Sequence, residues 1–471
     1  MEASRNGLCY ARFALDACAA AAARDSEVPS NPPQEGAGVN LNDPPAAGAD
    51  VRSSLQASYE TVRALSTRLA EPLSAEDQCV QSMPDASPVK WHLAHTTWFF
   101  ETLVLKAHAP DYRAFDARYA YLFNSYYEAL GPRHPRPRRG MLTRPSVDEV
   151  LSYRAHVDAA MEGFVASADL AALARAGPLI TLGLHHEQQH QELILTDLKH
   201  LLSLNPLQPA YVPAIAPTDV VAASQSPPCA LRWLDFPGGI HPIGHDGADF
   251  AFDNESPRHE VLLRPYRLAN RPVTCGEYLD FIRDGGYRRP ELWLSDGWAT
   301  VQAEGWQAPL YWSDLDAPRP TVFTLMGPRV LEPAEPVCHL SLYEAAAYAQ
   351  WADARLPTEF EWEAAAAGQF AGAHRYEYAY PHPVPASDVE GLQQLFGEVW
   401  DWTRSSYDPY PGFRPLAGAA GEYNGKFMVG QVVLRGGSCA TPPGHLRATY
   451  RNFFPPAARW QFSGLRLARD A

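Results

Sequence analysis

Hydrophobic residues between positions 52 and 205 recur at intervals of three and four, which is the spacing of amphipathic helices. Four stretches show this pattern: residues 55–69, 89–107, 147–165 and 180–202. Ser146 precedes the third stretch and Glu149 follows it three positions later, which is the pattern of an N-terminal capping box. Residues 112–144 lack the helical spacing. The sequence therefore predicts a four-helix bundle with one long functional loop.

The pattern changes completely after residue 205. Residues 206–230 are rich in Pro, Ala and Ser, the composition of a linker. Beyond them, short hydrophobic runs separated by Gly-Gly, Trp and Pro predict short strands, and only residues 275–283 and 342–354 predict helices. We expect a bundle over residues 51–205 and an irregular α+β domain over residues 231–471.

The first fifty residues differ from both regions. Residues 13–23 form an alanine-rich run that is too poor in Leu, Ile and Val for the hydrophobic segment of a signal peptide. Residues 25–50 consist mainly of Pro, Gly, Asn, Ala and Ser. We expect residues 1–50 to be a disordered extension.

Composition narrows the class of protein. A chain of 471 residues exceeds the usual size of a single core, and its net charge of −15 argues against a nucleic-acid partner. No apolar run approaches the roughly 20 residues that span a bilayer, so no membrane partner is expected. The seven cysteines are scattered and form no Cys-x-x-Cys pair, which indicates a reducing compartment. We expect a cytoplasmic protein that acts on small molecules.

The most informative motif is HEQQH at residues 186–190. On a helix, residues four apart share one face, so the imidazoles of His186 and His190 can bind one metal ion. Glu187 stands where zinc proteases place their general base. His185 is rotated by about 100° from His186, so we expect it on the surface or supporting the site.

A third ligand is available in residues 90–98, where His92 and His95 lie three apart on another predicted helix. Facing helices of a bundle commonly build metal sites from their core side chains. The alternative is that these imidazoles only form hydrogen bonds within the bundle. Three histidines suit Zn(II), Fe(II), Cu or Ni, and the ligand type alone does not decide between them.

With these residues the sequence resembles a known family. Leu93-Ala94-His95 followed by HEQQH is similar to the DinB-like domain of ergothioneine-biosynthesis sulfoxide synthases. The C-terminal part resembles the formylglycine-generating-enzyme (sulfatase-modifying-factor) domain fused to it. The matching segments of that part are residues 272–274, 354–363, 397–403, 435–438, 447–452 and 459–466. The resemblance covers residues 55–470 and implies a DinB-like four-helix bundle followed by a C-type-lectin-like α+β domain.

The resemblance implies a non-haem Fe(II) enzyme that uses O2. Such enzymes join the sulfur of cysteine or γ-glutamylcysteine to C2 of the imidazole of hercynine (Nα-trimethylhistidine), and the product is a sulfoxide. By this resemblance His95, His186 and His190 are the iron ligands. Gln189 matches the residue at the trimethylammonium group of hercynine, and Asn452 matches the residue that holds its carboxylate.

The loop of residues 123–128 resembles the paired-tyrosine segment of one branch of the family. In that branch a tyrosine near the iron supplies a proton or an electron, so Tyr126 and Tyr127 are both candidates. The alternative is that they are loop aromatics packed on the bundle. Nearby basic residues, foremost Arg133 and Arg136, can bind the carboxylate of an amino-acid donor bidentately. The alternative for them is a solvated loop that balances local charge.

The sequence leaves the identity of the sulfur or selenium donor substrate open. After Arg451-Asn452 the best-known branch has Trp-Asp, whereas this chain has Phe453-Phe454. The missing carboxylate disfavours γ-glutamylcysteine and favours cysteine or a different donor. Selenoneine synthase, a relative within the superfamily, uses a selenosugar and forms a C–Se bond at the same carbon.

Three rival functions share single features with this sequence. Formylglycine generation needs two reactive cysteines after Arg-Gly-Gly-Ser, and only Cys439 occurs there. A zinc protease would leave the C-terminal domain unexplained. A non-catalytic metal- or ligand-binding protein on the same scaffold is the remaining alternative, because fold alone does not determine function.

Overall fold

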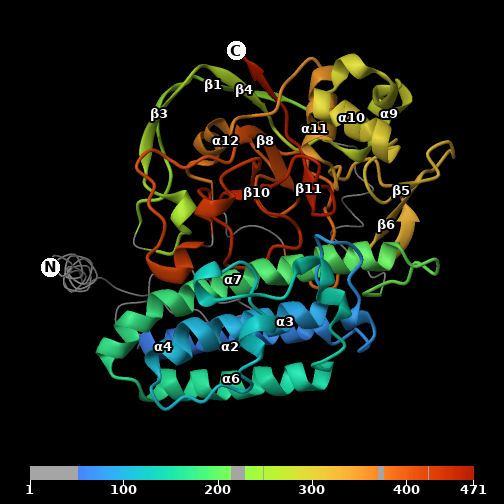
Figure 1. The fold of residues 1–471 in the computed structure, drawn as a ribbon. Coiled ribbons are helices and arrows are strands. Elements are labelled where there is room, and N and C mark those ends of the chain that lie inside the picture. Colours follow the sequence, from blue (N-terminus) through green and yellow to red (C-terminus); the bar gives the residue numbers. More distant parts are fainter. Residues whose placement is uncertain (1–50, 214–228, 248, 370–375, 423) are drawn as a thin grey trace, which may run out of the picture.

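The computed structural model describes residues 51–213, 229–247, 249–369, 376–422 and 424–471 (Figure 1). The predicted extension over residues 1–50 and most of the predicted linker lie outside these ranges. A helical part is followed by a sheet-rich part, which confirms the predicted fold class. Among the described residues, no helix combines the length and apolar character needed to cross a membrane.

Four long helical segments form the N-terminal part. They are α2 (Val51–Ala70), α3 (Val89–Phe99), α6 (Val147–Ser167) and α7 (Leu170–Ser203). Helix α3 continues through the π-helical turn η2 (Phe100–Leu105) into α4 (Lys106–His108). The capping box predicted at Ser146 and Glu149 is present at the start of α6. The long loop between α4 and α6 holds only α5 (Tyr119–Leu122), η3 (Glu128–Leu130) and η4 (Arg136–Met141).

Helix α7 begins ten residues earlier than the periodicity predicts. The Asp169 side chain accepts a hydrogen bond from the Ala172 backbone and caps the helix there. The helix then continues through Pro178, which is exposed and costs one backbone hydrogen bond. Figure 1 shows α7 lying between the other bundle helices and the sheet-rich part.

Where the structure describes it, the C-terminal part contains four small sheets. The first has the order β1 (Trp233–Phe236), β4 (Tyr266–Ala269), β12 (Ala468–Asp470), and the second β10 (Asn452–Phe454), β9 (Val432–Arg435), β8 (Trp400–Ser406), β11 (Ser463–Gly464). The others pair β2 (Gly239–Ile243) with β3 (His259–Leu263), and β5 (Trp312–Ser313) with β6 (Thr321–Thr324) and β7 (Gly327–Val330). Most pairs are antiparallel, and β11 runs parallel to β8.

Four helices occur among the described residues of the C-terminal part, two more than predicted. The predicted pair are α9 (Cys275–Arg283) and α11 (Leu342–Trp351), and the additional ones are α10 (Ser295–Glu304) and α12 (Glu359–Ala366). Helix α12 is short and buried on most sides, so it lacks an amphipathic pattern. Helix α10 buries only Gly297 and Val301 and has no side-chain cap, so its local signal is weak. Single 3-10 turns occur at η1 (Asp77–Cys79), η5 (Asp253–Glu255), η6 (Gly286–Arg288), η7 (Pro290–Leu292), η9 (Gly418–Glu422) and η10 (Gly425–Phe427).

One cluster of buried apolar side chains runs through both parts. It extends from Tyr59 and Val62 on α2, through Leu184 on α7, to Trp400 on β8 and Phe462. Because this core is continuous across α7, the helix that bears HEQQH is packed on both of its sides.

Candidate metal centre and substrate pocket

Three histidines from two helices converge in the bundle core. His95 comes from α3, and His186 and His190 come from successive turns of α7. One ligand atom of each lies within 4.8 Å of the other two, and His95 Nε2 is 3.2 Å from His186 Nε2. Within the described part of the chain, these three histidines are the one group of His, Cys, Asp or Glu side chains whose spacing could hold a metal ion. Of the two candidates left open by the sequence, the structure therefore brings His95 into the cluster.

Hydrogen bonds determine which nitrogen of two of these imidazoles faces the centre. His95 Nδ1 lies 2.6 Å from the Phe123 carbonyl oxygen, to which it can only donate, so its Nε2 keeps a lone pair. His190 Nδ1 lies 2.8 Å from His92 Nδ1, and His92 Nε2 lies 3.1 Å from Asp197 Oδ2. If His92 Nε2–H donates to the Asp197 carboxylate, His92 Nδ1 accepts a hydrogen bond from His190 Nδ1–H. The Nε2 lone pair of His190 is then available to a metal ion. Such outer partners orient metal-binding imidazoles.

The environment keeps the three imidazoles neutral. Burial lowers the pKa of each of them, and in His95 and His190 the neighbouring imidazoles lower it further. For His186 burial lowers the pKa to about 3. Neutral imidazoles offer the lone pairs that a metal requires. The donor set and its geometry thus fit a divalent transition metal with open positions.

Aromatic packing holds the His95 ring in place. The ring stacks between Trp91, at 4.6 Å and 13°, and Trp98, at 5.6 Å and 16°. Arg139 of η4 is buried, and its guanidinium lies 3.3 Å from the centre of the Trp91 ring. The ring therefore has little freedom to rotate away from the cluster.

Glu187 does not face the metal cluster. Its carboxylate accepts hydrogen bonds from Arg63 Nη1 at 2.8 Å, Arg154 Nη2 at 2.7 Å and Ser66 Oγ at 2.6 Å. Burial would raise its pKa, but the two guanidinium groups and Ser66 lower it to about 2. A carboxylate paired in this way anchors α7 to α2 and α6 and does not serve as a protease-type general base.

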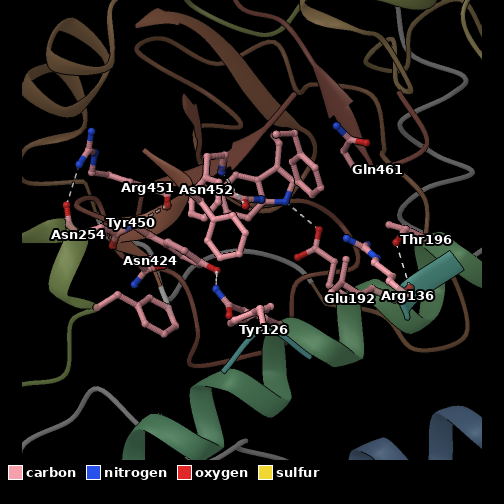
Figure 2. A pocket seen from close by; sticks show the side chains of 17 residues that line it. Tyr126, Arg136, Glu192, Thr196, Asn254, Asn424, Tyr450, Arg451, Asn452 and Gln461 are labelled. Carbon is pink, nitrogen blue, oxygen red and sulfur yellow. Dashed lines mark hydrogen bonds between the residues drawn. The ribbon is translucent and has the colours of Figure 1, made fainter. Parts of the chain in front are cut away.

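A cavity of about 200 Å³ lies between α7 and the C-terminal part (Figure 2). Its described lining includes Gln189, the neighbour of His190 on α7, but none of the three clustered histidines. Of the predicted substrate-binding residues, Gln189, Asn452 and Arg136 line it, and so does Tyr126. Arg133 does not line it, because its guanidinium pairs with Glu128 at the surface. Arg136 reaches the cavity while donating to the Asp85 carbonyl oxygen.

The two candidate tyrosines occupy different positions. Tyr126 is half-buried at the cavity, with its ring 5.1 Å from that of Phe427 and its carbonyl oxygen bound by Lys426. Tyr127 is fully buried behind it, 5.1 Å from the Tyr126 ring and 5.5 Å from the Trp98 ring. Burial raises the pKa of Tyr127 well above its usual value. Only Tyr126 of the two lines the cavity.

The structure also shows residues that sequence reasoning missed. The Glu192 carboxylate on α7 accepts hydrogen bonds from Trp400 Nε1, Ser438 Oγ and Thr441 Oγ1, at 2.5–2.8 Å. It thereby joins α7 to the Arg-Gly-Gly-Ser segment. No periodic signal could reveal this contact, because its partners lie more than 200 residues away along the chain.

The expectation of a surface position for His185 is wrong. Its ring is fully buried and stacks flat on Phe250, with centroids 3.8 Å apart. Its Nδ1 lies 3.0 Å from His445 Nδ1 in the C-terminal part. The helical rotation away from His186 was sound, but the C-terminal part packs on the face that an isolated bundle would leave exposed.

Comparison with known proteins divides the chain in the same way. Residues 58–194 match the DinB superfamily, and residues 233–471 match the sulfatase-modifying factor enzyme 1-like domain. Hercynine oxygenase of Mycolicibacterium smegmatis is 34% identical over 425 residues, which is 83% of this chain and 92% of that protein. Hercynine oxygenase of Mycobacterium tuberculosis is 35% identical over 437 residues, 87% of this chain and 96% of that protein. Ergothioneine biosynthesis protein 1 of Schizosaccharomyces pombe is 27% identical over 48% of this chain and 29% of its own length.

Proposed function

Because this chain belongs to the ergothioneine-biosynthesis sulfoxide synthase family, we propose that it is an Fe(II)- and O2-dependent enzyme acting on hercynine. It would form a carbon–sulfur or carbon–selenium bond at C2 of the hercynine imidazole, in ergothioneine or selenoneine biosynthesis. The observation that carries the proposal is that one helix, α7, bears both His186 and His190 of the buried three-histidine cluster and Gln189, which lines a cavity together with Asn452.

The overall reaction balances without a further reductant. Hercynine C–H, a donor R–SH and O2 give hercynine–S(=O)–R and water, or the selenium equivalent. The C–H and S–H bonds break, while one C–S and one S=O bond form. The two substrates lose four electrons, which O2 accepts, and its second oxygen atom leaves as water. Bound Fe(II) would supply the one-electron chemistry that lets O2 react with both substrates.

The chain's own side chains suit the two ends of hercynine. Gln189 lines the cavity and uses its Nε2 to donate to the Tyr450 hydroxyl, so its carbonyl oxygen would be left to attract the trimethylammonium group. Trp400 and Phe252 add aromatic faces for the same cation. Asn452 Oδ1 accepts from the Phe453 backbone at 2.9 Å, which leaves its N–H groups to bind the carboxylate.

The lining supports a neutral, hydroxyl-rich donor over an amino-acid donor. Glu192 is the one carboxylate among the described lining residues, and three hydrogen bonds from Trp400, Ser438 and Thr441 already occupy it. An amino-acid donor would bring an ammonium group with no anionic partner. Two cationic side chains also line the cavity: Arg451, which is paired with Glu359, and Arg136, which is able to bind a carboxylate. The neutral polar groups suit hydroxyls: Thr196, Asn254, Asn424 and Gln461. The lack of an unoccupied carboxylate among the described lining residues favours a selenosugar over cysteine or γ-glutamylcysteine.

O2 uptake with defined substrates tests the function. Protein loaded anaerobically with Fe(II) should bind about one iron per chain and consume O2 only with hercynine and a donor both present. Cysteine, γ-glutamylcysteine and a selenosugar are compared on one preparation, and the selenosugar should turn over fastest. His186→Ala should abolish iron binding and O2 uptake, whereas His156→Ala, an exposed histidine of α6, should change neither. Hercynine binding without O2 uptake under all conditions would instead support a non-catalytic binding protein.

We assign the proton- or electron-donating role to Tyr126, because it lines the cavity. Removing a proton donor from a reacting site typically costs about 10²–10⁴ in rate. Tyr126→Phe should lower kcat by this amount with little change in KM for hercynine. Tyr127→Phe is the matched change at the next residue. It should lower kcat by less than about tenfold, which is below the range expected for loss of a proton donor. The reverse ranking in steady-state kinetics would assign the role to Tyr127.

A further inference from the structure

Three polar side chains in series connect Gln189 to the interface between α7 and the C-terminal part. Gln189 Nε2 lies 2.6 Å from the Tyr450 hydroxyl, which lies 3.1 Å from His445 Nε2. His445 Nδ1 lies 3.0 Å from His185 Nδ1. Tyr450, His445 and His185 are all buried, and Figure 2 shows Tyr450 reaching towards the cavity wall formed by α7.

The series begins and ends on the same helix. His185 and Gln189 lie four residues apart, so they occupy one face of α7, and residues 445–450 bridge that turn from outside. His186 and His190 occupy the neighbouring face, about 100° further round the helix. The bridge therefore sets the rotation of α7 relative to the part of the molecule that provides the opposite cavity wall.

The ring positions in this bridge are held by stacking and charge. The Arg447 guanidinium lies 5.0–5.4 Å from the ring centres of Phe250, Phe252 and Tyr450, and the Glu255 carboxylate binds it. His185 stacks on Phe250 at an interplanar angle of 7°. The Tyr450 hydroxyl thus stays at one place beside the Gln189 amide.

The buried Tyr450 hydroxyl has one proton to donate, and within the series this proton is paired only when Tyr450 donates to one neighbour and accepts from the other, which favours a single direction of donation. In one order, the Gln189 amide N–H donates to Tyr450, the Tyr450 hydroxyl to His445 Nε2, and His445 Nδ1–H to His185. In the opposite order, His185 donates to His445, His445 to Tyr450, and Tyr450 to the Gln189 carbonyl oxygen. The structure has Nε2 of Gln189 at the Tyr450 hydroxyl, which is the first order. In that order the carbonyl oxygen of Gln189 takes no part in the bridge and is left for a cation in the cavity that Gln189 lines.

We infer that Tyr450 and His445 are positioning residues that select the cation-binding orientation of the Gln189 amide. The inference rests on the proposed function, because it concerns the trimethylammonium group of hercynine. A quaternary ammonium group has no N–H to donate, so it is attracted by a carbonyl dipole and repelled by an amide N–H. An inverted Gln189 would present the repelling pole. The bridge thereby makes the site specific for ligands with a cationic group at this position.

Binding of two ligands that differ in this group tests the inference. Hercynine and imidazole-4-propionate, which lacks the trimethylammonium group, are titrated into the metal-loaded protein by calorimetry. Tyr450→Phe should raise the Kd of hercynine about tenfold, since a hydrogen bond that supports a charge contact is of that order. The Kd of imidazole-4-propionate and the metal content should not change. Tyr266→Phe, which also removes a buried tyrosine hydrogen bond, is the matched control and should change neither Kd.

Two variants of His445 separate positioning from a structural role. His445→Leu breaks the bridge and should weaken hercynine binding as Tyr450→Phe does. His445→Gln can place its amide oxygen near the Nε2 position, where it accepts from the Tyr450 hydroxyl, and should restore most of the affinity. These variants also supply the answer if Tyr450→Phe does not fold.

The outcomes distinguish the inference from the function on which it rests. If the wild type binds hercynine and Tyr450→Phe binds it equally well, the inference is overturned and the function stands. If Tyr450→Phe weakens both ligands to the same extent, the effect is structural and the inference is overturned. If the wild-type protein does not bind hercynine, the proposed function itself fails, and the inference falls with it.

Discussion

The carboxylate of Asp197 is separated from the metal cluster by one imidazole. It faces His92 at 3.1 Å, and His92 in turn faces His190 at 2.8 Å. Asp197 also accepts the Ser87 backbone N–H at 2.8 Å, so its position is fixed from two sides. A negative charge here favours donation by His92 Nε2–H and therefore an acceptor at His92 Nδ1. That tautomer is the one that leaves His190 Nε2 available to the metal.

Replacing Asp197 by Asn should therefore weaken metal binding. Loss of such an outer partner costs roughly 10–100-fold in metal affinity. The measurement is a competition titration of Asp197→Asn with Fe(II) or Co(II) against a chelator. Asp169→Asn provides the same chemical change at the cap of α7, far along the helix from His190, and Asn also caps well. Equal metal affinities for Asp197→Asn and the wild type would show that His92 orients His190 without the carboxylate.

At the scale of elements, Gly183 of α7 and Gly163 of α6 lie in different surroundings. A Cβ on Gly183 would lie 2.6–2.9 Å from ring carbons of Phe99 and Phe100, so the missing side chain lets α7 approach the α3–η2 segment closely. The Phe99 ring is also 4.8 Å from the His186 ring. A Cβ on Gly163 would meet nothing within 4 Å. One glycine serves helix packing, and the other only weakens the helix.

The same substitution at these two positions should have opposite effects on stability. Gly163→Ala should raise the free energy of unfolding by about 0.5–1 kcal/mol, because alanine favours a helix over glycine. Gly183→Ala should lower it by about 1–3 kcal/mol through overpacking against the two phenylalanines. Urea denaturation of the metal-free proteins gives both values. If Gly183→Ala stabilised the protein, Phe99 and Phe100 would have to shift at little cost, and the packing argument would be wrong.

At the scale of the whole molecule, α7 joins the two parts through buried polar contacts. One of them places Lys199 Nζ 2.7 Å from His339 Nε2, with the Lys199 side chain wholly inside the protein. Burial lowers the pKa of Lys199 from 10.5 to about 8, although Cys338 and Cys439 oppose the shift. The ammonium group is therefore held in the interface at a cost in stability at neutral pH.

Because of this cost, the free energy of unfolding of the protein depends on pH. Between about pH 8 and 10.5 the unfolded chain binds a proton on Lys199 that the folded protein has lost, so stability rises with pH across this window. The gain is about 3 kcal/mol, since each pKa unit corresponds to about 1.4 kcal/mol. Lys199→Met lacks this contribution. Urea denaturation of both proteins from pH 7 to 11 should show the wild type gaining about 3 kcal/mol relative to the variant. A constant difference over this range would contradict the lowered pKa.

The sequence by itself determined the features that depend on neighbouring residues. The four-residue spacing of His186 and His190 and the capping box at Ser146 and Glu149 are both local, because helical geometry relates residues within one turn. The four bundle helices followed from periodicity for the same reason. Motif order along the chain was sufficient to indicate the two-part fold and the family.

Only the tertiary structure decided features that depend on how α7 docks. It brought His95 rather than His92 into the metal cluster, put Tyr126 but not Tyr127 at the cavity, and buried His185 against His445. These contacts join residues up to 260 positions apart, and no periodicity within one segment encodes them. The face of α7 that becomes covered is the one whose burial removes the most apolar surface of both parts from water. The site forms only once both parts have packed on that helix.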